Sequence, residues 1–267
     1  MFDIILVKPL VNALVALYSL FPFHDFGFAI ILLTLLIRAV LWPLQSQTLR
    51  SQKALNKLQP EIKKISEKYK NDPKKVQELT LELYKEKEVN PLSSCLPSLI
   101  QLPLLFALFY ALIKFKDANF LNLADPNTGL MAYLYPWLKN LGFVKSALSQ
   151  PFSTYLFGII DLAKPNVVLA VIAGATQFLQ TKLMTPKNQA SDQAAKTMSL
   201  MLYMFPALTV FIGFTLPGAL PLYWIITSGA AALQQYLIMY RDVDELDKEA
   251  VIEIKEDEEK KDKKKKK

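Results

Sequence analysis

The sequence predicts an all-α polytopic membrane protein, with a five-helix transmembrane core, a cytoplasmic helical hairpin and an N-terminal interfacial amphipathic helix. Two observations predict this class. Of the 267 residues, 52% are hydrophobic and 21% are charged, and the two classes are segregated into long apolar runs and lysine-rich blocks. A soluble domain mixes them along its length. The second observation is that the chain has a single cysteine, Cys95, and a single histidine, His24. These numbers exclude a disulfide framework and most zinc or iron sites.

Five apolar runs approach the roughly 20 residues that a helix needs to cross the hydrocarbon core of a bilayer. They are Phe26–Leu44, Leu92–Ile113, Val167–Met184, Ser199–Leu216 and Ala219–Tyr240. Pro217 and Gly218 predict a tight turn between the last two, which should therefore be antiparallel neighbours. We assign residues 26–240 to the membrane core, with an outer loop at 115–165.

Residues 1–25 predict an amphipathic helix that lies in the membrane interface. Their apolar residues recur at helical spacing, while Lys8, Asn12 and Ser19 interrupt the run. A signal peptide and a sixth span are the alternatives. Asp3 and the lack of an A-x-A cleavage pattern argue against a signal peptide.

Lysine and arginine in the loops predict the orientation of the chain. Gln45–Pro91 holds 11 of them, whereas the slightly longer Lys114–Pro165 holds five. Lys182–Met198 holds three, and the tail from Arg241 onward holds ten. The basic loops and the C-terminus should be cytoplasmic and the N-terminus outside, which requires an odd number of spans.

The cytoplasmic loop, residues 45–91, predicts a helical hairpin. Its apolar residues are spaced alternately three and four apart, as packed helices require: Leu55, Leu58, Ile62, Ile65, Tyr69, Val76, Leu79 and Leu83. Asp72 is a good N-cap and Pro73 a good first helical residue, so the second helix should begin there. The hairpin is either a solvated structural element or a mobile docking element.

The tail, residues 241–267, is of low complexity and ends in KKDKKKKK. Such a composition predicts disorder. A terminal lysine cluster beside a membrane can bind anionic lipid or the phosphates of ribosomal RNA. Composition alone does not choose between the two.

Arg38 lies inside the first predicted span, and none of the five spans contains an Asp or Glu. A central arginine costs about 2.5–3.5 kcal/mol on insertion scales. Its partner should therefore be water, a lipid phosphate, a neutral polar group or an external ligand. The alternative is that the side chain snorkels to the cytoplasmic interface.

Polar residues occur at a similar depth in four of the spans, most of them in the half nearer the cytoplasm. They are Thr34 and Gln45; Ser94, Ser98 and Gln101; Thr176, Gln177, Gln180 and Thr181; and Thr227 and Gln234. Isolated polar residues in spans often join helices to each other. Around a lone arginine they instead predict a wet cavity, open to the cytoplasm and closed toward the outside.

This pattern argues against three classes of membrane protein. A transporter usually carries acidic relay residues near the midplane, and a channel needs a polar path across the full thickness. An intramembrane protease needs a nucleophile and a base within the spans, but His24 lies in a loop. A half-channel with a positive charge suits the transfer of a polar, acidic segment partway into the bilayer.

Five stretches carry a family resemblance, in family order and at family-like spacing. They are GFAIILLTLLIRAVLWPLQSQTLRSQKALNKLQPEIKKISEKYKND, NPLSSCLPSLIQLPLLFALFYAL, AVIAGATQFLQTKL, MFPALTVFIGFTLPGALPLYW and the following QQYLI. They resemble the YidC/Oxa/Alb membrane protein insertases, in particular the short bacterial YidC-like forms. The resemblance implies that Arg38 is the arginine of a groove open to cytoplasm and lipid. It also implies groove-lining or substrate-contacting positions for Thr34, Gln101, Gln177, Tyr223 and Trp224.

The resemblance implies an insertase and chaperone in a bacterial cell (inner or plasma) membrane. Its partners would be nascent membrane proteins, the lipid bilayer and the Sec translocon, with ribosome contacts through the tail and hairpin. We expect no large extracytoplasmic domain before the core, as in the short forms, and no lipobox cysteine, unlike many of those forms. We expect no enzymatic activity, cofactor or metal, because no nucleotide motif is present. The alternative function is a scaffold or assembly chaperone whose Arg38 binds lipid phosphate.

Overall fold

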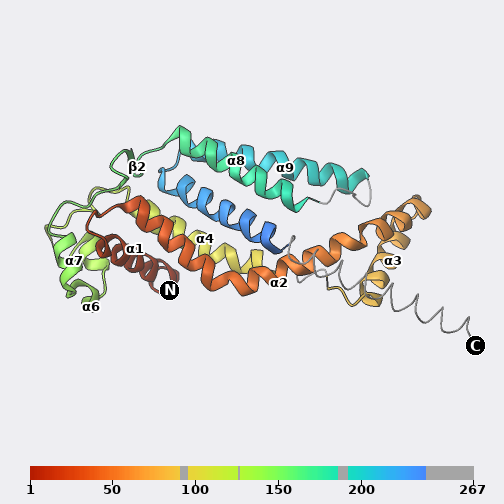
Figure 1. Cartoon of the computed structure of the whole chain (residues 1–267), viewed down its shortest axis with the longest axis horizontal. Helices are drawn as coiled ribbons and strands as arrows, with labels where there is room; N and C mark the ends of the chain where they lie inside the picture. Colours follow the sequence, from red (N-terminus) through yellow and green to blue (C-terminus); the bar gives the residue numbers. More distant parts are fainter. Residues whose placement is uncertain (91–95, 126, 186–191, 239–267) are drawn as a thin grey trace, which may run out of the picture.

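The computed structural model describes residues 1–90, 96–125, 127–185 and 192–238; for residues 96–101, 192–199 and 201 it describes the backbone alone. The described chain is mostly helical, with several apolar helices, as the predicted all-α class requires. The long helices are α2 (Phe26–Lys68), α4 (Leu96–Lys114), α8 (Val167–Met184), α9 (Asp192–Gly213) and a helix over residues 219–238. They run side by side along the molecule, with α3 (Pro73–Glu86) at one end (Figure 1).

Helix α2 is the longest helix of the described chain. Its 43 residues extend about 65 Å at 1.5 Å per residue, twice the thickness of a hydrocarbon core. It begins at Phe26 because the Asp25 carboxylate accepts a hydrogen bond from the Phe28 N–H at 2.7 Å. Pro43 and Pro60 lie inside it. The first half is apolar and the second half is charged, so the predicted first span and the first helix of the predicted hairpin form one continuous helix.

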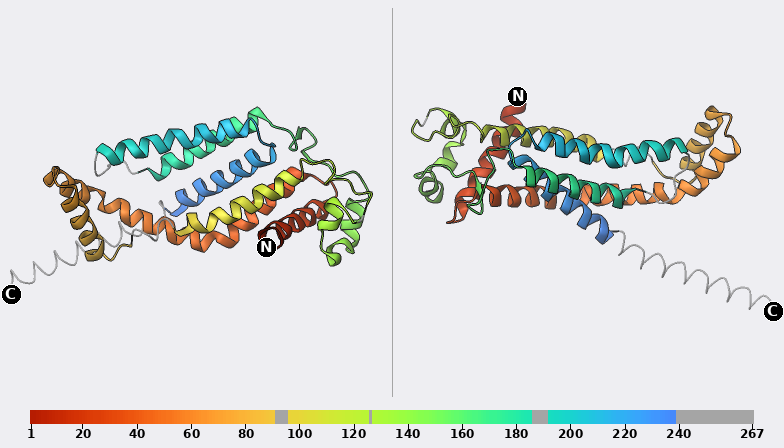
Figure 2. Two further views of the ribbon diagram at one scale, coloured as in Figure 1. Left: turned by 180° about the vertical axis from the view of Figure 1, so that it is seen from behind. Right: turned by 90° about the horizontal axis from the view of Figure 1, so that it is seen from above.

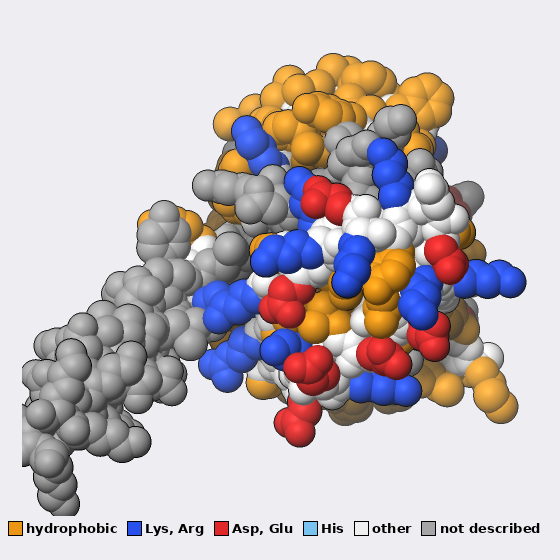
Figure 3. Space-filling view, turned by 90° about the vertical axis from the view of Figure 1, so that its right-hand side faces the viewer, with side chains coloured by type: hydrophobic (Ala, Val, Ile, Leu, Met, Phe, Trp, Pro, Cys, Tyr) orange, Lys and Arg blue, Asp and Glu red, His pale blue; other side chains and the backbone are white. Residues whose placement is uncertain are grey.

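Helix α3 folds back against the charged half of α2. Asp72 accepts a hydrogen bond from the Lys75 N–H at 3.0 Å, and Pro73 is the first residue of the helix. Leu58, Ile62 and Leu83 form a small buried cluster between the two helices. Lysines alternate with acidic side chains over this end of the molecule (Figure 3).

Helix α1 (Lys8–Leu20), preceded by the short π-helix η1 (Asp3–Val7), crosses the other end of the bundle obliquely (Figure 2, right). Its buried face packs on α2 and α4 through Val11, Leu14 and Val15, none more than 1% exposed. The segment Asp3–Leu20 also has the length and composition of a membrane span, as do Phe26–Lys68 and Val167–Met184. The interfacial placement of residues 1–25 therefore stays a prediction.

A compact cap, formed by residues 115–165 apart from 126, covers the same end. It contains α5 (Gly129–Tyr133), α6 (Pro136–Lys139), α7 (Gly142–Ala147) and a two-stranded antiparallel pair, β1 (Tyr155–Leu156) and β2 (Ile160–Asp161). The sequence predicted no strand here, because two residues are too few to show an alternating pattern.

Two polar residues tie the cap to the helices. Buried Asn12, which interrupts the apolar face of α1, donates to the Tyr133 carbonyl at 3.2 Å and accepts from the Tyr135 N–H at 2.7 Å. Asp25, the N-cap of α2, also accepts a hydrogen bond from the Phe157 N–H. Asn12, which interrupts the apolar face of α1, therefore joins that helix to the cap.

Helices α8 and α9 form a tight pair. A Cβ atom at Gly174 would lie 2.3 Å from a methyl carbon of Val210, so only glycine permits this approach. The turn after α9 is held to the cap, because the Gly218 N–H donates to the Lys164 carbonyl at 2.8 Å and the Ala219 N–H to the Leu162 carbonyl at 3.1 Å. The helix over 219–238 therefore starts at the cap and runs back along α2 (Figures 1 and 2).

The bounds of one helix differ from those of the predicted span that it contains. Helix α9 begins at Asp192, seven residues before the predicted start of the fourth span, and ends at Gly213, three residues before the predicted end at Leu216. The early start has a simple reason: Gln193, Ala194, Ala195 and Lys196 are good helix formers although they are not membrane-spanning residues. The ends of the second and fifth spans, at 92–95 and 239–240, lie outside the described residues, as does the tail.

Candidate functional site: a polar cavity beside Arg38

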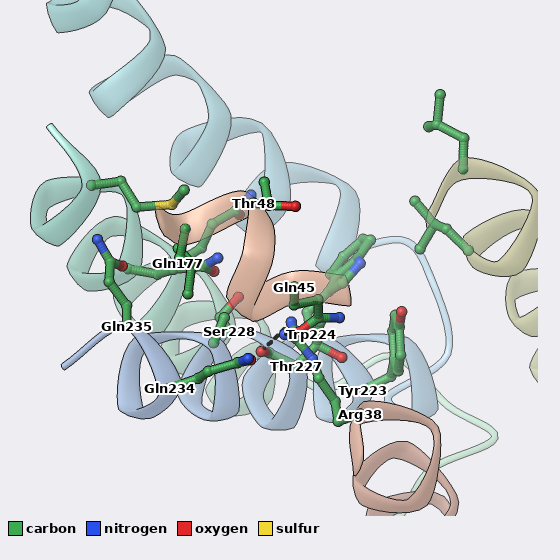
Figure 4. Close-up of a pocket in the computed structure, with 16 residues that line it drawn as sticks. Arg38, Gln45, Thr48, Gln177, Tyr223, Trp224, Thr227, Ser228, Gln234 and Gln235 are labelled. Atoms are coloured by element: carbon green, nitrogen blue, oxygen red, sulfur yellow. Dashed lines mark hydrogen bonds between the residues drawn. The ribbon is translucent and has the colours of Figure 1, made fainter. Parts of the chain in front are cut away.

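A cavity of about 420 Å³ lies among α2, α4, α8 and the helix over 219–238 (Figure 4). Its wall combines many polar side chains with one cation: Arg38, Gln45, Thr48, Gln177, Gln180, Thr227, Ser228, Gln234 and Gln235. No Asp or Glu of the described chain lines it. Arg38 is thus the single formal charge in the described wall of the cavity.

Arg38 projects from α2 and is held by two neutral acceptors. Its Nη1 donates to Gln45 Oε1 at 2.6 Å, and Gln45 lies about two turns further along the same helix. Its Nη2 donates to the backbone carbonyl of Thr227 at 2.7 Å, on the helix over 219–238. A guanidinium carries five N–H donors. The two bonds fix its orientation without neutralising its charge.

Gln234 forms hydrogen bonds between the helix over 219–238 and α2, nearer the α3 end than Arg38. Its Nε2 donates to the Trp42 carbonyl at 3.1 Å and to Ser46 Oγ at 3.0 Å. The residue is only 1% exposed, so these bonds replace the water that its amide loses on burial. Arg38 and Gln234 together join α2 to the helix over 219–238 along one side of the cavity.

The other predicted residues occupy different positions. Gln177 lines the cavity from α8, and its Oε1 accepts a hydrogen bond from the Thr209 hydroxyl of α9. Tyr223, which is buried, and Trp224, which is half-buried, also line it. Gln101 lies in α4, but its side chain is outside the described residues. Its neighbours Leu102 and Leu105 line the cavity.

Thr34 does not line the main cavity. It is 2% exposed, and its hydroxyl donates to the Ile30 carbonyl of its own helix at 2.7 Å. It lines a pocket of about 10 Å³, on the cap side, together with Arg38 and Tyr223. Its hydroxyl is directed along its own helix, so the groove-lining role expected for Thr34 stays a prediction.

The packing closes toward the cap. Between the cavity and the cap, α2 and α4 bury Ala29, Ile30, Ala107, Leu108 and Ala111, none more than 2% exposed. The polar side chains that line the main cavity lie on the α3 side of this buried apolar layer. The arrangement can hold a polar or negatively charged group at Arg38.

Sequence reasoning missed three polar residues of the wall: Thr48, Ser228 and Gln235. Thr48 lies three residues after Gln45, so helical spacing gave a usable signal for it. Ser228 and Gln235 directly follow Thr227 and Gln234, but adjacent residues on a helix normally face in different directions. They reach the same cavity because it extends around the side of the helix.

These features define a polytopic membrane protein with a partly buried polar cavity, and comparisons with known proteins define its family. The family model described as 60Kd inner membrane protein matches residues 16–245. The chain belongs to this family, which confirms the resemblance to the insertases.

Three relatives illustrate the match, each named membrane protein insertase YidC. The chain is 37% identical over 215 residues to that of Fusobacterium nucleatum, which covers 80% of the chain and 86% of the relative. It is 38% identical over 204 residues to that of Clostridium tetani, and this match covers 76% of the chain and 77% of the relative. It is 37% identical over 217 residues to that of Chlorobaculum parvum, covering 80% of the chain but 33% of that longer relative.

Proposed function

We propose that this chain is a membrane protein insertase and chaperone that receives the polar flank of a nascent membrane segment in the cavity beside Arg38. One observation carries the proposal. A guanidinium, held by Gln45 and the Thr227 carbonyl, faces a 420 Å³ polar cavity inside an otherwise apolar helical bundle. The relatives named as insertases support the same function.

The mechanism is physical and needs no covalent chemistry. An unaided polar flank must cross a hydrocarbon core about 30 Å thick. A wet cavity that extends to Arg38 removes part of that distance, and attraction to the guanidinium favours an acidic flank. The apolar segment then passes into lipid, where burial of about 20 apolar residues supplies the driving force.

The finer topology belongs to the same proposal. Five spans cross a bacterial inner membrane, with the N-terminus outside and the C-terminus in the cytoplasm. The cavity and the hairpin then face the cytoplasm, where a nascent chain arrives. The Sec translocon and the ribosome are proposed partners, the latter through the tail and the hairpin.

Insertion of a small single-span protein into liposomes that contain only this chain tests the proposal. Protection of the substrate's translocated flank from added protease is the readout. We expect protected flank with the purified chain and none with empty liposomes. Equal protection in both samples would leave the scaffold function, in which Arg38 binds lipid phosphate, as the better interpretation.

A further inference from the structure

The cap carries an apolar tip between β1 and β2, at the end of the bundle where α2 begins (Figure 1). The two strands pair so that residues 157–159 form this tip. Phe157 is 65% exposed and Ile159 is 81% exposed. Two large apolar side chains therefore project from a turn, where the favoured residues are small or polar.

The sequence around the tip is uncharged. The stretch from Ser146 to Ile160 contains no Asp, Glu, Lys or Arg, although Lys145 and Asp161 lie directly on either side of it. The backbone at Phe157 has a φ of +51°, a conformation that asparagine and glycine adopt more readily than an aromatic residue. The geometry of the turn therefore does not account for a phenylalanine at this position. The surroundings of its side chain must account for it.

The tip is fixed to the first turn of α2. One oxygen of the Asp25 carboxylate accepts a hydrogen bond from the Phe28 N–H at 2.7 Å, and the other accepts one from the Phe157 N–H. A Cβ atom at Gly27 would lie 2.6 Å from the Cβ of Leu156, so only glycine permits this close approach of β1 to α2. The depth of the tip in a bilayer therefore follows the depth of α2.

The first turns of α2 and α8 mark one boundary of the hydrocarbon core. Phe26 begins α2 and Val167 begins α8, and both helices have the length and composition of a membrane span. Because β1 packs on the first turn of α2, the tip lies at the level of this boundary. Aromatic side chains are favoured at such interfaces, and exposed apolar side chains gain free energy when they leave water.

We propose that the tip is a membrane anchor, in which Phe157 and Ile159 enter the interfacial layer of the lipid bilayer beside α2. The tip carries no charge, so the anchor requires no anionic lipid. Because Asp25 joins the tip to α2, the anchor fixes how deep that helix lies, with Arg38 about 18 Å further along it. The inference requires that the apolar helices span a bilayer, but it does not depend on insertase activity.

Nitroxide labels on single cysteines measure the depth of the tip, with the full-length chain in phosphatidylcholine vesicles. Cys95→Ser removes the chain's own thiol, and Ile159→Cys places a label on the tip. Collisions of the label with oxygen, which dissolves in hydrocarbon, are compared with its collisions with a water-soluble nickel chelate. We expect oxygen to dominate at this position, as at Val168→Cys, an exposed site on the first turn of α8. Lys145→Cys, an exposed site of the cap, is the control at which the nickel chelate should dominate.

Phe157→Asn tests the aromatic side chain without straining the turn, because asparagine adopts a positive φ more readily than phenylalanine. In this variant, the label at Ile159→Cys should collide with the nickel chelate at least roughly twofold more often, because the tip loses part of its apolar surface. Thermal unfolding in detergent should be unchanged, which shows that the variant is folded.

Three results would overturn the proposal. Dominance of the nickel chelate at Ile159→Cys would place the tip in water. Protection of that label from both reagents would show that protein, and not lipid, covers the tip. An unchanged collision rate in Phe157→Asn would remove Phe157 from the anchor. Since the labels are read without a substrate, each of these failures would leave the insertase proposal standing.

Discussion

Replacement of Arg38 provides the sharpest test of how the cavity works. Arg38→Ala removes the single formal charge of the described cavity wall, while Arg38→Lys keeps a charge but loses the paired bonds to Gln45 and Thr227. Two unit charges 4 Å apart attract by about 4 kcal/mol at an effective dielectric constant of 20, and by about 1 kcal/mol in bulk water.

The gain from placing a substrate carboxylate in the cavity is therefore at most about 3 kcal/mol. Arg38 is partly exposed, so solvent screening reduces this to about 1.5 kcal/mol, or roughly a tenfold change in an equilibrium. We expect Arg38→Ala to lower insertion of a substrate with an acidic translocated tail about tenfold. A neutral-tailed version of the same substrate should be affected much less.

The assay is protease protection in liposomes that contain only the purified chain, with both tails tested on each variant. Arg38→Lys should retain much of the wild-type insertion. Normal insertion of the acidic tail by a folded Arg38→Ala protein would refute a direct role for the charge. Equal loss in Arg38→Ala and Arg38→Lys would show that guanidinium geometry matters instead, and equal loss for both tails would indicate a structural role.

Three further predictions follow from individual contacts, and a fourth follows from the charge of the tail. Thr34→Val should leave insertion nearly unchanged, because the hydroxyl bonds to its own helix; a loss as large as that of Arg38→Ala would contradict this. Gln234→Leu should lower the free energy of unfolding by about 1–3 kcal/mol, measured by thermal unfolding in detergent, because it leaves acceptors on α2 without their donor. Ile62→Asp should destabilise the packing of α3 on α2 by more than about 2 kcal/mol and expose the loop to protease, with Lys63→Gln as the silent control. Deletion of residues 260–267 should weaken ribosome co-sedimentation and its dependence on salt while post-translational insertion persists; unchanged co-sedimentation would shift the contact to the hairpin.

The sequence determined the existence of the main helices, because their signals are local. Apolar runs of sufficient length marked α2, α8 and the helix over 219–238. The cap at Asp72 acts on an N–H group only three residues away, so the residue type alone predicted it; the cap at Asp25, which was not predicted, carries the same local signal. Helix α9 begins before the predicted span, since an apolar run predicts where a chain crosses lipid and not where a helix begins.

The sequence also marked Arg38 as a residue without an acidic partner in any predicted span. It left the actual partner open. One acceptor is Gln45, seven residues away on the same helix, and this spacing was visible. The other is the backbone carbonyl of Thr227, 189 residues away. Every residue has a carbonyl, so no residue type could have signalled that contact.

The tertiary structure decided which polar residues share a cavity. Thr34 and Gln45 lie on the same face of α2 as Arg38, yet only Gln45 lines the main cavity. A short threonine side chain reaches the carbonyl of its own helix, whereas the longer glutamine reaches across to the guanidinium. Residues from four helices meet at this point because the Gly218 turn, anchored to the cap, directs the last helix back along α2. That contact joins distant parts of the chain, so only the folded structure could reveal it.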